Sequence, residues 1–317
     1  MSDWLMDNLP EGIRERIAPA LEEARKVATS ISTPDSLSEE LPTLAPMLQG
    51  IDPLVIAVNL EDLKRLEKAA TVCAACQGID SCALGTSGMR PRLAQSPGFV
   101  RVVAEACEFR KGHDTMQISM RKSSAGKRFM DRTFANFENR RGTEDALRVA
   151  LEIAEDERAA GAIFSGPPGG GKSHLAAAIQ HRNAERGVVT IFHDTTALFG
   201  ILRSGSRGDG EEYENAVREC INAKVLILDD IDKVSAGSRD GALSPFAQEA
   251  IFRIINGRYE RDGQTVVTCN SDLTQIERRL GDVGPAIVSR LLEMCRYVVV
   301  NATDYRQEHA GGARNAQ

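Results

Sequence analysis

The sequence predicts an α/β fold in which helices cover a parallel β-sheet, preceded by a smaller helical domain. Three observations indicate this arrangement. Strand-like and helix-like segments alternate through the C-terminal part of the chain, and a glycine-rich loop joins one of these strands to one of these helices. The N-terminal part instead combines amphipathic helical periodicity with closely spaced cysteines. We therefore expect an N-terminal domain over residues 1–111, a linker over 112–127 and an α/β domain over 128–310.

The composition limits the classes of protein to which the chain can belong. Of its 317 residues, 42% are hydrophobic and 26% are charged, and the net charge is −6, as in ordinary globular proteins. The first residues, Met1 to Trp4, lack the features of a signal peptide, and no apolar run reaches the length of a membrane span. We therefore expect a cytoplasmic protein, in which the seven cysteines stay reduced and either bind metal or are buried.

The N-terminal domain is expected to contain two helices separated by a less ordered segment. Residues 10–28 predict an amphipathic helix because five side chains fall on one face: Ile13, Ile17, Leu21, Ala24 and Ala28. Residues 29–46 are rich in Ser, Pro and Thr, so we expect a linker or a loosely ordered chain there. Leu60, Leu63 and Leu66 mark a second, short helix that leads into the cysteines.

The α/β domain is expected to alternate between strands and helices. Its predicted helices lie near residues 146–153, 173–186, 212–222 and 246–259. Its predicted strands lie near residues 162–164, 188–192, 224–228, 265–268 and 297–300. Alternation of this kind implies a parallel sheet with helices on both faces.

The residues from Gly166 to Ser173 fit the pattern G-x-x-x-x-G-K-[ST] of a phosphate-binding loop (P-loop) without a mismatch. Its glycines let successive backbone N–H groups surround the phosphates, Lys172 reaches the β- and γ-phosphates, and the Ser173 hydroxyl ligates Mg²⁺. The helix that follows directs its positive end at the nucleotide. The predicted set that binds a nucleoside triphosphate is Gly166, Pro167, Pro168, Gly169, Gly170, Gly171, Lys172, Ser173 and His174.

Two acidic residues, Asp229 and Asp230, follow the apolar strand 224–228. A buried strand would hold them at the edge of the sheet where α/β proteins bind ligands. Asp229 would complete the Mg²⁺ shell with Ser173, and Asp230 would orient and deprotonate the attacking water. The alternative interpretation of such paired acids is a solvated turn or a helix cap.

Two further residues are candidates for catalysis. Asn270, at the end of strand 265–268, could hydrogen-bond the γ-phosphate or the water, although Asn at a strand end is common in turns. Arg290 is a candidate arginine finger that would act on a neighbouring subunit's nucleotide; a surface or salt-bridge residue is the alternative.

Four cysteines near the N-terminal domain predict a zinc site. Cys73 and Cys76 form a Cys-x2-Cys pair, Cys82 follows closely, and a folded loop between Gly85 and Ala106 would have to return Cys107 to the metal. Four thiolates suit the tetrahedral coordination of structural zinc. His113 is the substitute for Cys107 as fourth ligand, and small buried thiols are the alternative interpretation.

Residues 90–141 form the basic part of the chain. They carry 12 basic and 5 acidic side chains, a difference of +7. A polyanion such as single-stranded DNA is therefore an expected partner here, and a solvated basic linker is the alternative. The candidate contact residues are Arg121, Lys122, Lys127 and Arg128.

Several tracts together resemble the DnaC/DnaI-type bacterial helicase loaders. The resemblance begins at Lys127–Phe137, continues through the P-loop, Asp229-Asp230-Ile231, Thr268–Ser271 and Ser289-Arg290-Leu291, and ends at Asn301–Arg306. It implies an AAA+ ATPase that assembles ATP-bound subunits around single-stranded DNA, with Mg²⁺ as the cofactor and without a C-terminal helical lid. Asp230 stands where most AAA+ proteins have Glu, which implies slow hydrolysis. The cysteines and Met89–Leu93 resemble the DnaI-type zinc-binding domain, whose role in that family is to hold the hexameric replicative helicase during replication initiation or restart.

Three alternatives remain open on the sequence. An IstB-like transposition ATPase shares the ATPase core and the missing lid, but that group typically lacks a zinc module. A zinc-stabilised adaptor would use the nucleotide only to set its conformation. A P-loop kinase for a small molecule is disfavoured because the chain shows no insert for binding a phosphate acceptor.

Overall fold

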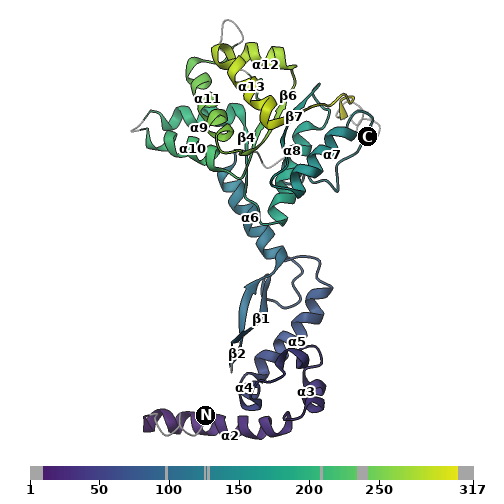
Figure 1. Cartoon of the computed structure of the whole chain (residues 1–317), viewed down its shortest axis with the longest axis vertical. Helices are drawn as coiled ribbons and strands as arrows, with labels where there is room; N and C mark the ends of the chain where they lie inside the picture. The colour runs from purple at the N-terminus through teal and green to yellow at the C-terminus, as the bar shows by residue number, and fades with distance from the viewer. Residues whose placement is uncertain are drawn as a thin grey trace, which may run out of the picture. The chain divides into compact units, whose positions relative to one another are not determined.

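The computed structural model describes residues 10–96, 99–124, 126, 129–207, 210–233 and 242–305. The chain forms two compact units, Met1–Arg110 and Lys111–Gln317, whose helices and strands are labelled in Figure 1. Among the described residues, no helix combines the length and the apolar character that crossing a membrane would require.

The N-terminal unit is a group of helices with one β-hairpin. Its elements are α2 (Glu11–Ser30), α3 (Pro34–Glu40), η1 (Ala45–Leu48), α4 (Pro53–Val58), α5 (Leu60–Ala74), β1 (Met89–Ser96) and β2 (Phe99–Ala106). The two strands are antiparallel and pair Met89 with Ala106. The hairpin occupies most of the stretch that we expect to be a folded loop, and it places Cys107 directly after the end of β2.

The prediction of a loosely ordered chain over residues 29–46 is wrong. This segment contains α3 and the start of η1, and its leucines are buried in the core of the unit. Thr33 and Ser36 form a capping box with Pro34 at the first helical turn, so the Ser, Pro and Thr residues begin a helix here. The buried core comprises Ile31, Leu37, Leu41, Leu44, Ala45, Leu48, Ile56, Leu63, Leu66 and Val100.

The second unit contains a five-stranded parallel sheet in the order β4-β5-β6-β3-β7. The strands are β3 (Gly161–Ser165), β4 (Thr190–Asp194), β5 (Val225–Asp229), β6 (Gln264–Cys269) and β7 (Cys295–Val299). The helices are α6 (Glu108–Lys122), α7 (Glu144–Glu155), α8 (Lys172–Glu185), α9 (Thr195–Gly205), α10 (Glu211–Asn222), α11 (Pro245–Tyr259), α12 (Leu273–Leu280), η3 (Gly281–Val283) and α13 (Gly284–Met294). The predicted α/β fold with a parallel sheet is confirmed.

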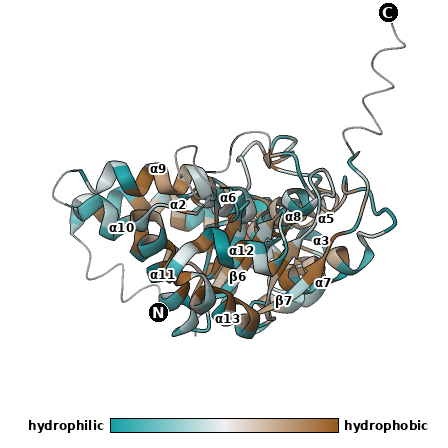
Figure 2. Ribbon diagram, turned by 90° about the horizontal axis from the view of Figure 1, so that it is seen from above, coloured by the Kyte–Doolittle hydropathy of each residue, from teal (hydrophilic) through white to brown (hydrophobic). Residues whose placement is uncertain are grey.

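Helices cover both faces of this sheet. Successive strand residues point to opposite faces, so Ala162 and Phe164 of β3 pack with α7 and α8, whereas Ile163 packs with the helices on the other face. That second core includes residues of α9, α10, α11, α12 and α13. Figure 2 shows the apolar stretches of α9 and α13 in brown. The expected absence of a C-terminal lid concerns the chain after β7, most of which lies outside the described residues.

The predicted linker over residues 112–127 is largely helical, because α6 extends to Lys122. Ser119 and Ser123, one turn apart, accept hydrogen bonds from the backbone N–H groups of Thr190 (3.1 Å) and Phe192 (2.9 Å). These N–H groups belong to the edge strand β4 and would otherwise lack a strand partner. The polar residues that indicate a linker therefore include two serines that satisfy the backbone N–H groups at the open edge of the sheet.

Candidate functional site

Strand order brings the predicted nucleotide-binding and catalytic residues to one edge of the sheet. The P-loop follows β3, Asn270 follows β6, and Asp230 follows β5, and β6 lies between the other two strands. The strands are parallel, so these three segments meet at the carboxyl edge. Asn270 is thus placed between the P-loop and the acids.

The P-loop requires its glycines because other parts of the chain approach it closely. Gly166 has φ +150°, and a Cβ there would lie 2.0 Å from the Val300 carbonyl oxygen. Gly171 has φ +97°, and a Cβ there would lie 2.8 Å from the Phe137 ring. Helix α8 begins at the next residue, so its free N–H groups face the loop. The loop therefore has the backbone form that surrounds phosphates.

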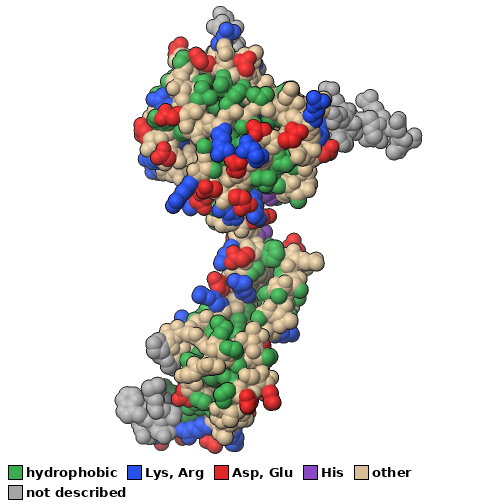
Figure 3. All heavy atoms as spheres, turned by 45° about the vertical axis from the view of Figure 1, so that its right-hand side comes forward, with side chains coloured by type: hydrophobic (Ala, Val, Ile, Leu, Met, Phe, Trp, Pro, Cys, Tyr) green, Lys and Arg blue, Asp and Glu red, His purple; other side chains and the backbone are tan. Residues whose placement is uncertain are grey.

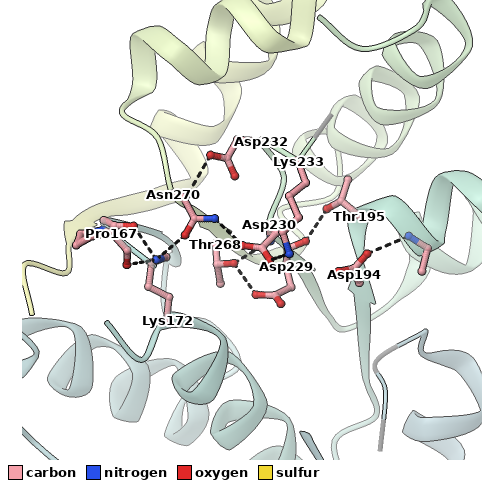
Figure 4. Close-up of polar contacts among 12 residues, drawn as sticks. Pro167, Lys172, Asp194, Thr195, Asp229, Asp230, Asp232, Lys233, Thr268 and Asn270 are labelled. Atoms are coloured by element: carbon pink, nitrogen blue, oxygen red, sulfur yellow. Dashed lines mark hydrogen bonds and ion pairs between the residues drawn. The ribbon is translucent and has the colours of Figure 1, made fainter. Parts of the chain in front are cut away.

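Lys172 is buried in the loop, with 4% of its surface exposed. Its Nζ donates hydrogen bonds to the carbonyl oxygens of Gly166 (2.7 Å) and Pro167 (2.8 Å) and to Asn270 Oδ1 (3.0 Å), as Figure 4 shows. Burial lowers the pKa of Lys172, and nearby acids, Asp230 first among them, oppose that change. The ammonium is thus held among oxygen atoms at the mouth of the P-loop.

Asp229 is almost fully buried, with 1% of its surface exposed, and has one unsatisfied oxygen. Oδ1 accepts a hydrogen bond from Thr268 Oγ1 (2.6 Å), whereas Oδ2 has no hydrogen-bond partner among the described residues. Burial is the main cause that raises the pKa of Asp229; Thr268 and Ser173 act in the opposite direction. A buried carboxylate oxygen near a hydroxyl fits Mg²⁺, which prefers oxygen ligands.

Asp230 is held in a left-handed backbone conformation, with φ +55°. Its N–H donates to Thr268 Oγ1 (2.9 Å), and its Oδ1 accepts a hydrogen bond from Asn270 Nδ2 (3.0 Å). Its Oδ2 forms an ion pair with Lys233. Because Asn270 contacts both Lys172 and Asp230, one amide connects the P-loop lysine with the predicted general base (Figure 4).

A cavity of about 490 Å³ lies beside the P-loop. Residues 129–140 form part of its wall, and they contact helix α8 and Tyr305. The His174 Nε2 atom lies 2.9 Å from the Thr133 carbonyl oxygen, and Arg140 stacks on the Tyr305 ring at 5.2 Å. The lining residues are Phe129, Arg132, Asn136, Phe137, Glu138, Arg140, Pro168, Gly169, Gly171, Lys172, Ser173, His174, Asp230, Lys233, Asn270 and Tyr305.

Sequence reasoning missed much of this wall. Phe137 and Tyr305 fall within tracts that resemble the loaders, but nothing in the spacing of either tract assigns it to the cavity. Arg140 and Lys233 lie in none of the motifs recognised in the sequence. Aromatic rings and guanidinium groups can stack on a nucleobase, so Phe137, Arg140 and Tyr305 are the candidates for that contact.

The model of one protein family, described as IstB-like ATP binding protein, matches residues 102–313 of the chain. This chain belongs to the IstB-like ATP binding proteins. The match covers the P-loop, the acids and Asn270, so ATP is the nucleotide that this family assigns to the site.

Curated relatives of this family member include insertion-sequence and replication proteins. It is 31% identical over 170 residues to the insertion-sequence ATP-binding protein y4iQ/y4nD/y4sD of Sinorhizobium fredii, covering 52% of this chain and 54% of the relative. It is 28% identical over 162 residues to the insertion sequence IS21 ATP-binding protein of Pseudomonas aeruginosa (50% and 57%). It is 27% identical over 183 residues to the replicative helicase loader DnaC of Escherichia coli (56% and 71%). The chain thus spans little more than half the length of the two insertion-sequence relatives.

Solved structures similar to this chain include DnaI and the DnaC helicase loader. The crystal structure of DnaI has a TM-score of 0.48 and 19% identity, covering 58% of this chain and 95% of that one. The crystal structure of the DnaC helicase loader has a TM-score of 0.47 and 26% identity, covering 55% and 99%.

Arg290 does not line the cavity of its own chain. It lies on α13, where Nε donates to Asn256 Oδ1 (2.9 Å) and the guanidinium lies over the Phe252 and Tyr259 rings at 5.4 and 5.6 Å. Its assignment as an arginine finger therefore stays a prediction about a neighbouring subunit.

The four N-terminal cysteines share a neighbourhood. Burial raises the pKa of Cys73, and Cys76, Cys107 and Cys82 add to that increase. The Cys107 N–H donates to the Gly88 carbonyl oxygen (2.8 Å). Within the described ranges, however, no group of three or more His, Cys, Asp or Glu side chains is arranged to hold a metal ion. Zinc at these cysteines therefore stays a prediction.

Two details complete the cysteine region. Backbone N–H groups of Gly88, Thr86 and Leu84 lower the pKa of Cys82 to about 7. The substitute ligand His113 lies on α6 in the second compact unit, where its Nδ1 is 3.2 Å from Asp114 Oδ1.

The predicted DNA-contact residues are only partly described. Arg121 is exposed near the end of α6, and Lys122 pairs with Glu219 (2.6 Å). Lys127 and Arg128 lie outside the described residues. On the face that Figure 3 shows, Lys and Arg side chains are interspersed with Asp and Glu. DNA binding by these residues stays a prediction.

Proposed function

We propose that the second unit binds ATP with Mg²⁺ and hydrolyses it. The observation that carries this proposal is the linked set of Lys172, Asn270 and Asp230 beside the unsatisfied oxygen of Asp229. Lys172 would hold the β- and γ-phosphates, and Ser173 and Asp229 would hold the metal. Bound Mg²⁺ supplies neutralisation of phosphate charge.

The chain's own residues account for the hydrolytic step. Asp230 accepts the proton of a water molecule whose oxygen attacks the γ-phosphate, and Asn270 positions that water or the phosphate. Elsewhere in the cavity wall, three side chains hold the adenine base of the nucleotide: Phe137, Arg140 and Tyr305. Arg290 of an adjacent subunit would stabilise the transition-state charge, which makes ATP-dependent self-assembly part of this proposal.

We further propose that the chain loads a hexameric replicative helicase onto single-stranded DNA in the cytoplasm. The family match begins at residue 102, so nearly all of the N-terminal unit lies outside it. That unit has its own buried core, and its cysteine spacing resembles the helicase-holding domain of the DnaI-type loaders. The similarity to DnaC supports the same assignment.

A second candidate function is ATP-dependent transposition. The IstB-like family model and the two insertion-sequence relatives favour it. An adaptor that binds ATP without turnover is a third candidate, which complete absence of hydrolysis with DNA and partner present would support.

Light scattering on a sizing column distinguishes loading from transposition. The full chain is mixed with the replicative helicase of its host, with and without ATP and a single DNA strand. The loader proposal expects a stable complex that is lost when Cys73, Cys76, Cys82 and Cys107 are replaced by Ser. ATP-driven self-assembly on DNA without helicase binding would instead support transposition.

Zinc at the four cysteines stays a prediction from their spacing. Their shared neighbourhood supports it. Metal analysis of the purified chain tests it directly: zinc at about one ion per chain is expected if four cysteines ligate it.

A further inference from the structure

The carboxylate of Asp230 has both of its oxygens engaged. Oδ1 accepts a hydrogen bond from Asn270, and Oδ2 is paired with the Lys233 ammonium. A general base needs a free lone pair directed at the water whose proton it takes. Each carboxylate oxygen has two lone pairs, so Asn270 and Lys233 each occupy one of them, and the ammonium competes with a water molecule for Oδ2.

The local backbone places Lys233 over the acid. The Lys233 N–H donates to the Asp230 carbonyl oxygen (2.9 Å), which closes a turn and brings the two side chains to the same side. Lys233 also lines the nucleotide cavity. Asp230 is the main cause that raises the pKa of Lys233, with Asp194 and Asp229 acting in the same direction. The ammonium is therefore directed at the site.

The two lysines of the cavity differ in how firmly they are held. Lys172 is buried and makes three hydrogen bonds to oxygen atoms. The Lys233 side chain is 49% exposed. The Asp230 side chain is only 12% exposed, but it keeps the hydrogen bond from Asn270 when water replaces it at the half-exposed ammonium, so the pairing with Lys233 is reversible.

We propose that Lys233 is a positioning residue that restrains Asp230 and slows hydrolysis without weakening nucleotide binding. This proposal rests on the proposed ATPase function. In the hydrolytic step, the water oxygen bonds to the γ-phosphorus, its proton passes to Asp230, and the bond between the γ-phosphorus and the oxygen of ADP breaks. Departure of Lys233 from Oδ2 removes a cation that competes for this oxygen and frees a second lone pair for the proton.

The test replaces Lys233 in the full chain and separates turnover from binding. Lys233→Met is expected to raise kcat by about fivefold, a change of about 1 kcal/mol in the barrier. The affinity for a fluorescent ATP analogue should stay within about twofold, because Lys172 keeps its contacts. Lys233→Arg keeps a cation at the carboxylate and should retain the slow rate.

Two controls connect the effect to Asp230. Lys224→Met makes the same substitution at a surface lysine that pairs with Glu157, and it should leave kcat unchanged. Asp230→Asn combined with Lys233→Met should lose the acceleration, because the base that is released is absent.

The outcomes separate this inference from the function on which it rests. If the wild-type chain hydrolyses ATP and the kcat of the Lys233→Met variant is equal or lower, only the proposed role of Lys233 is overturned. Binding of the analogue with no hydrolysis in either chain would overturn the ATPase proposal and the restraint with it. Faster turnover with unchanged affinity supports both.

Discussion

The nucleotide site and the cysteine region were both predicted from spaced motifs, but the two regions differ in how closely the fold brings the predicted side chains together. At the nucleotide site, neighbouring parallel strands hold Asn270 within hydrogen-bond distance of both Lys172 and Asp230. In the N-terminal unit, a hairpin brings Cys107 towards the other thiols, but the described side chains form no metal-binding group. Hydrogen bonding between neighbouring strands fixes the positions of the loops that follow them, and so the distances between their side chains. The cysteines instead lie on a helix end, a loop and the end of a hairpin, which do not fix the distances between the thiols.

The largest expected effect is at the nucleotide site, with Lys172→Ala. Removing the ammonium takes away a charged hydrogen-bond donor for the phosphates, so ATP affinity should fall by about 10- to 100-fold and hydrolysis should be lost. Equilibrium binding of a fluorescent ATP analogue measures the first effect and phosphate release the second.

A matched control for this prediction is Lys224→Ala. Lys224 is exposed and pairs with Glu157, so its loss should leave affinity unchanged. Unchanged ATP binding in the Lys172 variant would contradict the assignment of the P-loop.

An intermediate effect is expected from Leu41→Ala, which tests whether the two regions are independent. Leu41 is completely buried in the N-terminal core, so its truncation should destabilise that unit by about 3 kcal/mol. ATP affinity should not change, because the nucleotide cavity is lined by residues of the second unit. Urea unfolding and nucleotide binding on the same samples provide the measurement.

The control variant for Leu41 is Met47→Ala, at a side chain that is 58% exposed. It should cost well under about 1 kcal/mol. If ATP affinity falls together with stability in the Leu41 variant, the two regions are coupled and the comparison fails.

The smallest expected effect concerns the reactivity of the cysteines in metal-free protein. Thiolate is the reactive form, and the pKa of Cys82 is lowered to about 7 while that of Cys73 is raised by burial. At pH 7, iodoacetamide should therefore modify Cys82 several-fold faster than Cys73. Its rate should fall as the pH drops below about 7 and level off above it, which peptide mass spectrometry can follow.

Adding zinc to the same reaction sharpens the comparison. Protection of all four thiols would show that a metal completes the arrangement that the cysteines alone do not form. Equal rates for Cys82 and Cys73 would contradict the environment described for Cys82.

Much of the α/β domain follows from local signals. Residues 162–164 and 224–228 are short apolar runs next to turn residues, so their strands are recognisable. Helix α9 is missed because it starts directly after β4, with Asp194 acting both as the last strand residue and as the helix cap. No glycine or proline separates the two elements, so no local signal marks the change.

Two polar segments differ from the form that their composition indicates, and tertiary packing is the reason in both. The polar residues of α6 indicate a linker, but in the structure Ser119 and Ser123 accept hydrogen bonds from backbone N–H groups of the edge strand β4. The Ser, Pro and Thr of residues 29–46 likewise indicate loose chain until the intervening leucines are seen in a core. In both cases the residue types are ambiguous by themselves, and a distant partner decides their role.

The sequence by itself determined the P-loop, the paired acids and the parallel α/β fold, because each depends on neighbours within a few residues or on simple periodicity. Only the tertiary structure decided that Asn270 connects Lys172 to Asp230 and that Lys233 forms an ion pair with Asp230. It also decided which side chains line the cavity, among them Phe137, Arg140 and Tyr305. These contacts join residues from separate loops, and their distances are set by strand order and side-chain packing rather than by spacing along the chain.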